Sequence, residues 1–320
     1  MLPIPNPLMF EVFGINIRWY GVIVVLAALA GAWLAGKQAA RKGENPNYVW
    51  DALFLALIVG LIGARLYHVL SSPATSTVNF QFYLDNPWIN VSVLGLQFPF
   101  PRVLAIWEGG LGIYGGIVGG TLGLIAFLKW NKLPILRWLD FGAVGLLLGQ
   151  AIGRWGNYFN QELYGYPTNA PWGIPIDADH RLPQFTQFSS GTWFHPTFLY
   201  ESLLCLVGVV FLLWVSRRFQ GRLLDGDITN LYLVVYPAIR LFTEFQRPDA
   251  WLFNGIPVAQ IVSSTLLAAA VVVFVVRHFV LHQKPAPVSV PAEGAGPEGP
   301  KSPVRRKGRV LDPQKQKSRP

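Results

Sequence analysis

The 320-residue chain carries 26 lysine and arginine residues against 17 aspartate and glutamate residues, a formal net charge of +9, yet only 13% of its residues are charged and 52% are hydrophobic. About a quarter of the residues of a soluble globular domain are charged, so the composition excludes an ordinary soluble protein and favours one polytopic membrane domain. The single cysteine, Cys205, excludes an internal disulfide framework and a cysteine-based metal site, and we expect it to be a small buried apolar side chain.

Seven stretches are long and apolar enough to predict transmembrane helices. In chain order they cover residues 19–36, 49–70, 104–128, 135–154, 198–215, 228–246 and 257–281. A polar connection at about 156–197, between the fourth and fifth spans, is too long for a turn and predicts a small extramembrane lobe. The predicted fold is an all-α polytopic membrane protein, with residues 1–283 forming a seven-helix transmembrane domain.

The basic residues predict the orientation of this domain. Nineteen of the 26 lysine and arginine residues follow the first, third, fifth and seventh predicted spans. Cytoplasmic loops carry such an excess, so the N-terminus and the lobe are predicted outside and the C-terminus in the cytoplasm. The positive net charge therefore requires no nucleic acid partner. Residues 284–320, rich in Pro, Gly, Lys and Arg, predict a disordered cytoplasmic tail whose basic cluster can touch anionic membrane lipids.

With this orientation, most of the unusual polar side chains fall at the outer ends of independent helices. Ionisable groups within a membrane normally face the interior of a bundle or a wet cavity and pair with one another. Interfacial snorkelling accounts for Arg18 and Trp107, but less well for Arg154 and Arg240, which lie in apolar helix ends with carboxylates nearby. The polar residues in question are Arg18, Trp19, Tyr20, Arg65, Tyr67, His68, Trp107, Glu108, Tyr114, Arg154, Asn157, Asn160, Glu162, His195, Tyr200, Glu201, Tyr236, Arg240 and Glu244.

Helical spacing groups several of these side chains. Tyr236, Arg240 and Glu244 stand at i, i+4 and i+8, on one helical face. Arg154, Asn157 and Gln161 share a face if their helix continues. Two arginines with amide and carboxylate neighbours suit an oxyanion such as phosphate, and at this depth the phosphate would belong to a phospholipid head group. A purely structural arginine–glutamate pair is the alternative.

The third span contains "GGLGIYGGIVGGTLG", residues 109–123, with two interleaved GxxxG ladders. One ladder is Gly112, Gly116 and Gly120, and the other is Gly115, Gly119 and Gly123. Such ladders predict close helix–helix packing. That packing could hold Tyr114 against the polar cluster.

Several kinds of chemistry lack their motifs in this chain. There is no HExxH, no P-loop and no GxSxG. Of the five histidines, only His68 and His195 could join an outer site. We therefore expect neither a metal ion nor a cofactor.

The stretch "GRWGNYFNQELYG", residues 153–165, resembles the signature of bacterial prolipoprotein diacylglyceryl transferases, G-R-x-G-N-[FY]-x-N-x-E-x-x-G. Five further blocks are similar to that family, in its order, and the similarity covers residues 10–282. These blocks are "IRWYG", "GARLYHVL", "WEGGLGIYGGIVGG", "HPTFLYES" and "YPAIRLFTEFQRPD".

The resemblance implies transfer of the sn-1,2-diacylglyceryl group from phosphatidylglycerol to a cysteine thiol. That cysteine lies in the lipobox of a prolipoprotein signal peptide, the new bond is a thioether, and glycerol phosphate leaves. The family works without a metal at the outer face of the bacterial cytoplasmic (inner) membrane.

The resemblance also implies roles for individual residues. Arg154 would bind the phosphatidylglycerol head group, with help from Asn157, Asn160 and Glu162, and Gly165 would shape the turn. Arg240 and Glu244 would form the second essential element. Tyr20 and Tyr236 would line the site, with His195 and Arg65 as further candidates.

One position departs from the pattern. Some family members have a histidine where this chain has Tyr114, and that histidine has been proposed to activate the thiol. Either Tyr114 acts as the base with a lowered pKa, or the base is Glu244 or Glu162, or the histidine has another role.

Two other classes of protein compete with the transferase. A phospholipid or anionic-solute transporter should show repeat symmetry and broken helices at the midplane, and no convincing internal repeat is visible. A structural membrane scaffold leaves the clustered arginines and glutamates unexplained.

Overall fold

The computed structural model describes residues 4–12, 15–72, 78–93, 96–105 and 109–284. Contacts divide the chain into two units, Met1–Val288 and Ser289–Pro320, and every described residue belongs to the first. Trp107, Glu108 and the predicted tail beyond Lys284 lie outside the described residues.

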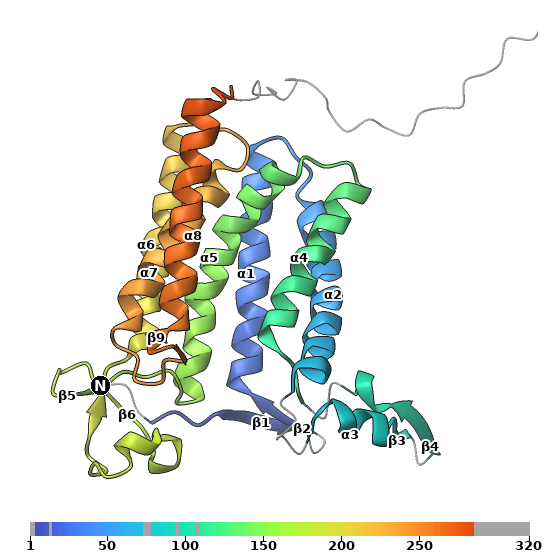
Figure 1. Ribbon diagram of the computed structural model, residues 1–320, viewed down its shortest axis with the longest axis vertical. Coiled ribbons are helices and arrows are strands. Elements are labelled where there is room, and N and C mark those ends of the chain that lie inside the picture. The colour runs from blue at the N-terminus through green and yellow to red at the C-terminus, as the bar shows by residue number, and fades with distance from the viewer. Residues whose placement is uncertain (1–3, 13–14, 73–77, 94–95, 106–108, 285–320) are drawn as a thin grey trace, which may run out of the picture. The chain divides into compact units, whose positions relative to one another are not determined.

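Long helices dominate the described part of the chain and run side by side in Figure 1. They are α1 (Trp19–Arg41), α2 (Asn47–Ser71), α4 (Ile113–Trp130), α5 (Ile135–Phe159), α6 (Thr197–Arg218), α7 (Asp227–Glu244) and α8 (Val258–Val275), with a π-helical turn at Val276–Val280. All of these except α7 are long and apolar enough to cross a membrane. The chain is a multi-pass membrane protein, and six of the seven predicted spans are confirmed as candidate spans. The remaining one, the sixth predicted span at 228–246, corresponds to α7, which is a helix but includes the charged residues Asp227, Arg240 and Glu244.

The predicted start of the third span, residue 104, is wrong, because α4 begins at Ile113. Arg102–Leu104 form a separate 3₁₀ turn. Gly109 and Gly110 have φ angles of +82° and +69°, in the left-handed region, which interrupts a right-handed helix. Hydropathy alone does not reveal this break, because most of the surrounding residues are apolar, although Glu108 directly precedes the two glycines.

Close glycine contacts hold the bundle together in two helix pairs. In the pair of α1 with α5, a Cβ on Gly31 would lie only 2.6 Å from the carbonyl oxygen of Gly145. In the pair of α2 with α4, a Cβ on Gly119 would lie 2.5 Å from the carbonyl oxygen of Val59. Glycine is therefore required at both crossings, and the GxxxG ladders of the third span predict the second of them.

Both predicted ladders face α2, but they approach it to different extents. In the first ladder a Cβ on Gly112 would clash with the ring of Tyr67. Gly115, Gly119 and Gly123 are buried against α2. At Gly116 and Gly120, by contrast, a Cβ would find its nearest neighbours at 3.6 and 3.5 Å, which is ordinary van der Waals contact. The core continues between α5, α6 and α7, where Cys205 is fully buried as predicted.

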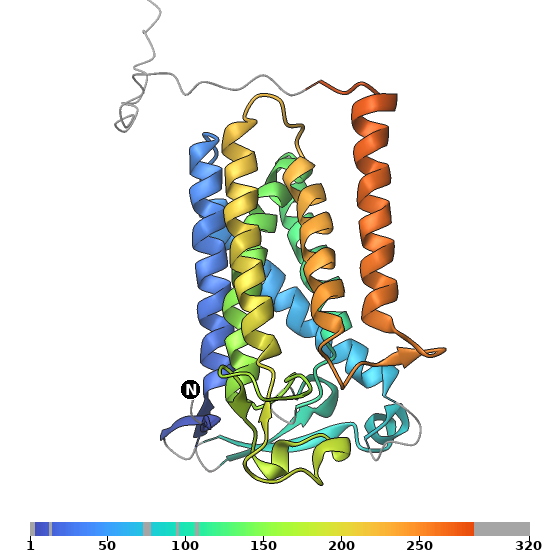
Figure 2. The ribbon, with the colours of Figure 1, turned by 90° about the vertical axis from the view of Figure 1, so that its left-hand side faces the viewer.

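The connections contain short strands that the all-α prediction missed. The antiparallel pairs are β1 (Leu8–Val12) with β2 (Ile15–Arg18), β3 (Trp88–Val93) with β4 (Leu96–Pro101), and β8 (Leu252–Phe253) with β9 (Ile256–Pro257). A further sheet has the order β5 (Pro167–Thr168), β7 (Trp193–Phe194), β6 (Ile174–Pro175). Figures 1 and 2 show these strands, and the short helix α3 (Phe80–Asp85), gathered at one end of the bundle.

We call this end the lobe end, because the segment between α5 and α6 folds there around its own core. Phe194 is fully buried in this core, and Tyr164, Ile174 and Phe185 pack around it. The buried Arg181 donates hydrogen bonds to backbone carbonyls, including that of Ile176 at 3.0 Å. We call the opposite end of the bundle, where α1 ends and α5 begins, the tail end.

Candidate active site

The stretch 153–165 leaves α5 and turns back at the lobe end. The helix ends at Phe159, and Gln161 and Leu163 then adopt φ angles of +51° and +56°. Gln161 therefore does not share a helical face with Arg154. Its side-chain amide instead binds Asp177 of the lobe, donating to the carboxylate at 2.6 Å and accepting from the backbone N–H at 2.8 Å.

Arg154 meets side chains from two other helices. Its Nη2 lies 2.6 Å from Oε1 of Glu201 on α6 and donates to the Tyr236 hydroxyl on α7 at 3.2 Å. The Tyr236 hydroxyl lies 3.4 Å from the same carboxylate oxygen, to which it donates. Glu201 is only 4% exposed, so its negative charge depends on Arg154 for compensation. Glu201 was not among the predicted site residues, although a carboxylate within an apolar helix was the available signal.

A second polar layer lies one helical turn deeper. Gln150, four residues before Arg154 on α5, donates to the Tyr232 hydroxyl at 3.0 Å. The rings of Tyr232 and Tyr236 are parallel, with centroids 5.9 Å apart. The stacked rings, together with the hydrogen bonds that each tyrosine hydroxyl makes to α5, fix the position of Tyr236 beside Arg154. Neither Gln150 nor Tyr232 was predicted.

Arg240 and Glu244 form the pair that the spacing on α7 predicts, with Nη2 and Oε2 2.6 Å apart. Nη1 of Arg240 is buried and has no hydrogen-bond partner among the described residues. A buried donor without an acceptor is unfavourable, and a ligand oxygen would satisfy it. Arg240 also interacts electrostatically with Arg154, Glu201 and Arg247, so the two arginine centres belong to one charged cluster.

Glu162 is held by the end of α5. Its Oε1 accepts hydrogen bonds from the side-chain amides of Asn157 at 2.8 Å and Asn160 at 3.3 Å. The Glu162 side chain is exposed, whereas Asn157 is buried. The two amides thus orient a carboxylate that an incoming ligand can reach.

Gly165 lies where two backbone segments approach closely. Its N–H donates to the carbonyl oxygen of His195 at 2.8 Å, and a Cβ here would lie 2.8 Å from the carbonyl oxygen of Gln246. The φ angle of Gly165 is not positive. The residue is therefore needed for space rather than for a left-handed turn.

We expect Gly165→Ala to destabilise the protein by about 1–3 kcal/mol, since the overpacked segments must move apart. Gly153→Ala is the matched control in the same stretch, because a Cβ there meets nothing within 4 Å. Thermal unfolding of the two purified variants measures the difference. Equal melting temperatures would show that the segments around Gly165 can move apart without a cost in stability.

The remaining predicted residues lie at the edges of this cluster or away from it. The ring of Tyr20, 40% exposed, packs on Gly156, where a Cβ would lie 2.8 Å from Tyr20 Cδ2. His195 Nδ1 lies 2.9 Å from the hydroxyl of Tyr200. Tyr200 in turn accepts from Trp172 Nε1 at 2.8 Å, so this histidine belongs to the contact between the lobe and α6.

Tyr114 and Arg65 lie on the α2–α4 pair. Tyr114 is 50% exposed, and its ring centroid is 5.9 Å from that of Tyr67 on α2. Arg65 is 2% exposed and donates to backbone carbonyls on both sides of the undescribed residues 106–108, including Val103 at 2.8 Å and Gly110 at 3.3 Å. These bonds anchor the segment before α4, so the contacts of Arg65 are structural.

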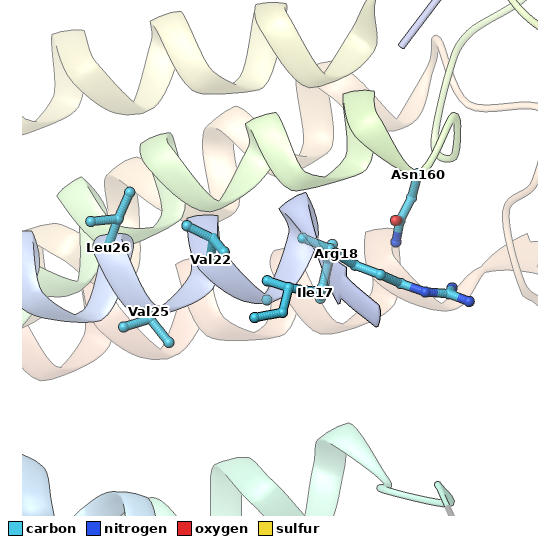
Figure 3. Close-up of a pocket in the computed structure, with 8 residues that line it drawn as sticks. Ile17, Arg18, Val22, Val25, Leu26 and Asn160 are labelled. Atoms are coloured by element: carbon cyan, nitrogen blue, oxygen red, sulfur yellow. The ribbon is translucent and has the colours of Figure 1, made fainter. Parts of the chain in front are cut away.

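A groove of about 650 Å³ runs along α1 at the lobe end. Arg18 and Asn160 stand at one end of it, and Val22, Val25 and Leu26 follow along the helix (Figure 3). None of the described residues forms an ion pair with Arg18. The groove, defined by these five residues, thus has one cationic, polar end and a long apolar wall.

Within the described part of the chain, no group of three or more His, Cys, Asp and Glu side chains is placed to hold a metal ion. The chemistry that the cluster offers is therefore that of arginines, carboxylates, amides and phenols.

Comparison with known proteins agrees with the resemblance seen in the sequence. The model of the prolipoprotein diacylglyceryl transferase family matches residues 7–276. A phosphatidylglycerol–prolipoprotein diacylglyceryl transferase from Chloroflexus aggregans is 38% identical over 88% of this chain and 91% of its own length. An enzyme of the same name from a Nostoc strain is 38% identical over 82% of this chain and 86% of its own length. Another, from Gloeobacter violaceus, is 39% identical over 81% of this chain and 88% of its own length. The chain belongs to the prolipoprotein diacylglyceryl transferase family.

Proposed function

We propose that this protein transfers the diacylglyceryl group of phosphatidylglycerol to the lipobox cysteine of prolipoproteins. The observation that carries the proposal is the arginine cluster at the lobe end, where Arg240 presents a buried, unsatisfied N–H donor close to Arg154. The names of the relatives support both substrates. No cofactor enters the proposed reaction.

The proposed step is a displacement at the glycerol carbon that bears the phosphate. The cysteine sulfur forms the new C–S bond after its proton is removed, and the C–O bond breaks with its electron pair going to the departing glycerol phosphate. Arg154 and Arg240 stabilise the charge that grows on the leaving phosphate. Each arginine uses Nη2 in its ion pair, which leaves the Nη1 donor of Arg240 for a phosphate oxygen.

We further propose the orientation that the basic residues predict. The N-terminus and the lobe at 156–197 face the outside of the bacterial cytoplasmic membrane, and α7 also crosses it, as the sixth span in chain order. Residues 1–283 then form the catalytic domain and 284–320 a basic cytoplasmic tail. This orientation brings the arginine cluster to the outer leaflet, where phosphatidylglycerol and the lipobox can meet by lateral diffusion.

The base that accepts the thiol proton is proposed to be a carboxylate, Glu162 or Glu244, rather than Tyr114. Glu162 is exposed and oriented by two amides. Among the described residues, none forms a hydrogen bond with the Tyr114 hydroxyl, and the half-exposed ring packs beside Tyr67 on the α2–α4 pair rather than in the arginine cluster.

Tyr114→Phe is accordingly expected to retain the transfer rate within about threefold, whereas loss of a general base lowers the rate by about 10²–10⁴-fold. Initial rates with a lipobox peptide measure both this variant and Glu162→Gln. A loss of 10²-fold or more in Tyr114→Phe would make the tyrosine hydroxyl the base.

The groove on α1 is proposed to receive the acyl chains of the phospholipid. Its apolar wall suits a hydrocarbon chain, and Arg18 suits the phosphate above it. Tyr20 and Asn160, which are both candidate substrate-binding residues, also line this groove and connect it with the stretch 153–165.

Val25→Trp fills the groove and should raise the KM for phosphatidylglycerol about fivefold, the effect of losing roughly 1 kcal/mol of binding. Val24→Trp is the matched control, since Val24 is also exposed on α1 but does not line the groove. The KM for the lipobox peptide should stay unchanged. A rise in the peptide KM instead would assign the groove to the signal peptide.

The proposed function is tested with purified protein, phosphatidylglycerol and a synthetic lipobox peptide. Mass spectrometry should detect the peptide with one diacylglyceryl group added, and a peptide with its cysteine replaced by serine should gain nothing. An unmodified peptide under conditions where the protein stays folded would reject the transferase and favour the transporter alternative.

A further inference from the structure

A small, partly open cavity lies at the tail end, at the opposite end of the bundle from the arginine cluster. Its volume is about 50 Å³, and its walls come from the ends of α1 and α6, the start of α5 and the segment before α7. Its charged lining consists of Arg41, Lys42, Arg137, Asp140 and Asp225. Three cations against two carboxylates leave the lining with one excess positive charge.

Both carboxylates in this lining are already engaged elsewhere. Asp225 forms an ion pair with Arg137 at 3.1 Å, and Arg137 also pairs with Glu44 at 3.0 Å. Asp140 accepts backbone hydrogen bonds from Gly226 and Thr229, both at 2.7 Å, and a third from the Thr229 hydroxyl at 2.8 Å. Neither acid forms an ion pair with Arg41 or Lys42 among the described residues, although both interact electrostatically with Lys42.

Arg41 has only neutral partners. Its Nη1 donates to Oε1 of Gln38 at 3.0 Å, and its Nη2 donates to the Ser216 hydroxyl at 3.4 Å. The nearby charge that acts on it most is another cation, Arg217. The guanidinium is thus held at the cavity wall without a compensating anion.

Lys42 is the least satisfied of these cations. Its ammonium group has neither a hydrogen bond nor an ion pair with any described residue, although the residue is partly buried. Burial, and then the positive charge of Arg41, lower the pKa of this ammonium group, and the carboxylates of Asp225 and Asp140 offset part of that effect. A desolvated cation of this kind is stabilised by an anion that enters the cavity.

The size of the cavity limits that anion. One water molecule occupies about 30 Å³ in the liquid, so 50 Å³ admits a single small tetrahedral group and no acyl chain or nucleoside. We propose that the tail-end cavity binds one phosphate group between Lys42 and Arg41, supplied by a phospholipid head group or by free phosphate. This site does not depend on the transferase function. The anion would join the end of α1 to the start of α5.

The test compares Lys42→Gln with Lys37→Gln in the full-length protein in neutral detergent. Lys37 lies on the same helix, is exposed and stands over the ring of Trp33, away from the cavity. Melting temperature is followed by tryptophan fluorescence with inorganic phosphate, with phosphatidic acid and with diacylglycerol. Phosphatidic acid and diacylglycerol differ only by the phosphate group. Phosphate bound at the lobe end would shift both variants equally. A difference between the two variants therefore reports binding in the tail-end cavity.

At saturation, phosphate or phosphatidic acid should raise the melting temperature of the wild type and of Lys37→Gln by at least about 3 °C. Diacylglycerol should not, and in Lys42→Gln most of the shift should be lost. A response to phosphatidic acid alone identifies a lipid head group, and a response to both ligands shows that free phosphate suffices.

Arg41→Gln provides the second variant in case Lys42→Gln unfolds, and it should lose the shift in the same way. The proposal is overturned if neither ligand shifts the wild type. It is equally overturned if the variants at 41 and 42 respond as strongly as Lys37→Gln.

Discussion

Arg154→Gln is expected to lower the rate of diacylglyceryl transfer by about 10³-fold, the upper range for losing one preorganised donor to a developing anion. Arg154 is the cation that links α5 to Glu201 on α6 and Tyr236 on α7. Its loss removes positive charge where the leaving phosphate is proposed to gain negative charge. Initial rates of lipobox-peptide modification, followed by mass spectrometry, measure this effect.

The same substitution also disturbs the fold, and a second variant separates the two effects. Without Arg154, the Glu201 carboxylate stays buried with no cation, which destabilises a protein by about 3–5 kcal/mol. The double variant Arg154→Gln, Glu201→Gln replaces the ion pair with two amides that can bond to each other. We expect it to recover most of the melting temperature and none of the transfer. Recovery of both would mean that Arg154 has a structural role only.

The sequence predicted those parts of the site that depend on local spacing. Arg240 and Glu244 are four residues apart on one helix, so their ion pair follows from helical periodicity alone. The pair of Arg154 with Glu201 joins two helices 47 positions apart, and its formation depends on how each helix is rotated about its axis. Apolar composition does not determine that rotation. For this reason Glu201 was named among the polar helix ends but not assigned to the site, and Gln150 and Tyr232 were missed.

Backbone geometry explains the remaining differences in the fold. The two glycines with positive φ before α4 decide where that helix begins, although most of the surrounding residues are apolar. The strands of the lobe sheet are two residues long, too short to produce an alternating pattern. Arg65 lies at the outer end of its predicted span, as the candidate site residues do, yet its partners are backbone carbonyls, which no residue pattern specifies.

Arg240→Lys tests the second centre through a single atom. Lysine keeps the positive charge and can still pair with Glu244, so the melting temperature should change little. It lacks the second nitrogen of the guanidinium, which corresponds to the buried, unpaired Nη1 of Arg240. We therefore expect transfer to fall by about 10²-fold, the lower range for loss of one donor to a developing anion.

The matched control is Arg137→Lys, the same chemical change in an arginine that is paired with Glu44 and Asp225 at the tail end. If Nη1 of Arg240 binds the phosphate, Arg137→Lys should keep the wild-type transfer rate while Arg240→Lys loses it. A loss confined to kcat would place this contact in the transition state, whereas a rise in KM alone would place it in substrate binding. Wild-type kcat and KM in Arg240→Lys would show that only the charge matters, because the lysine preserves that charge and removes the forked donor geometry.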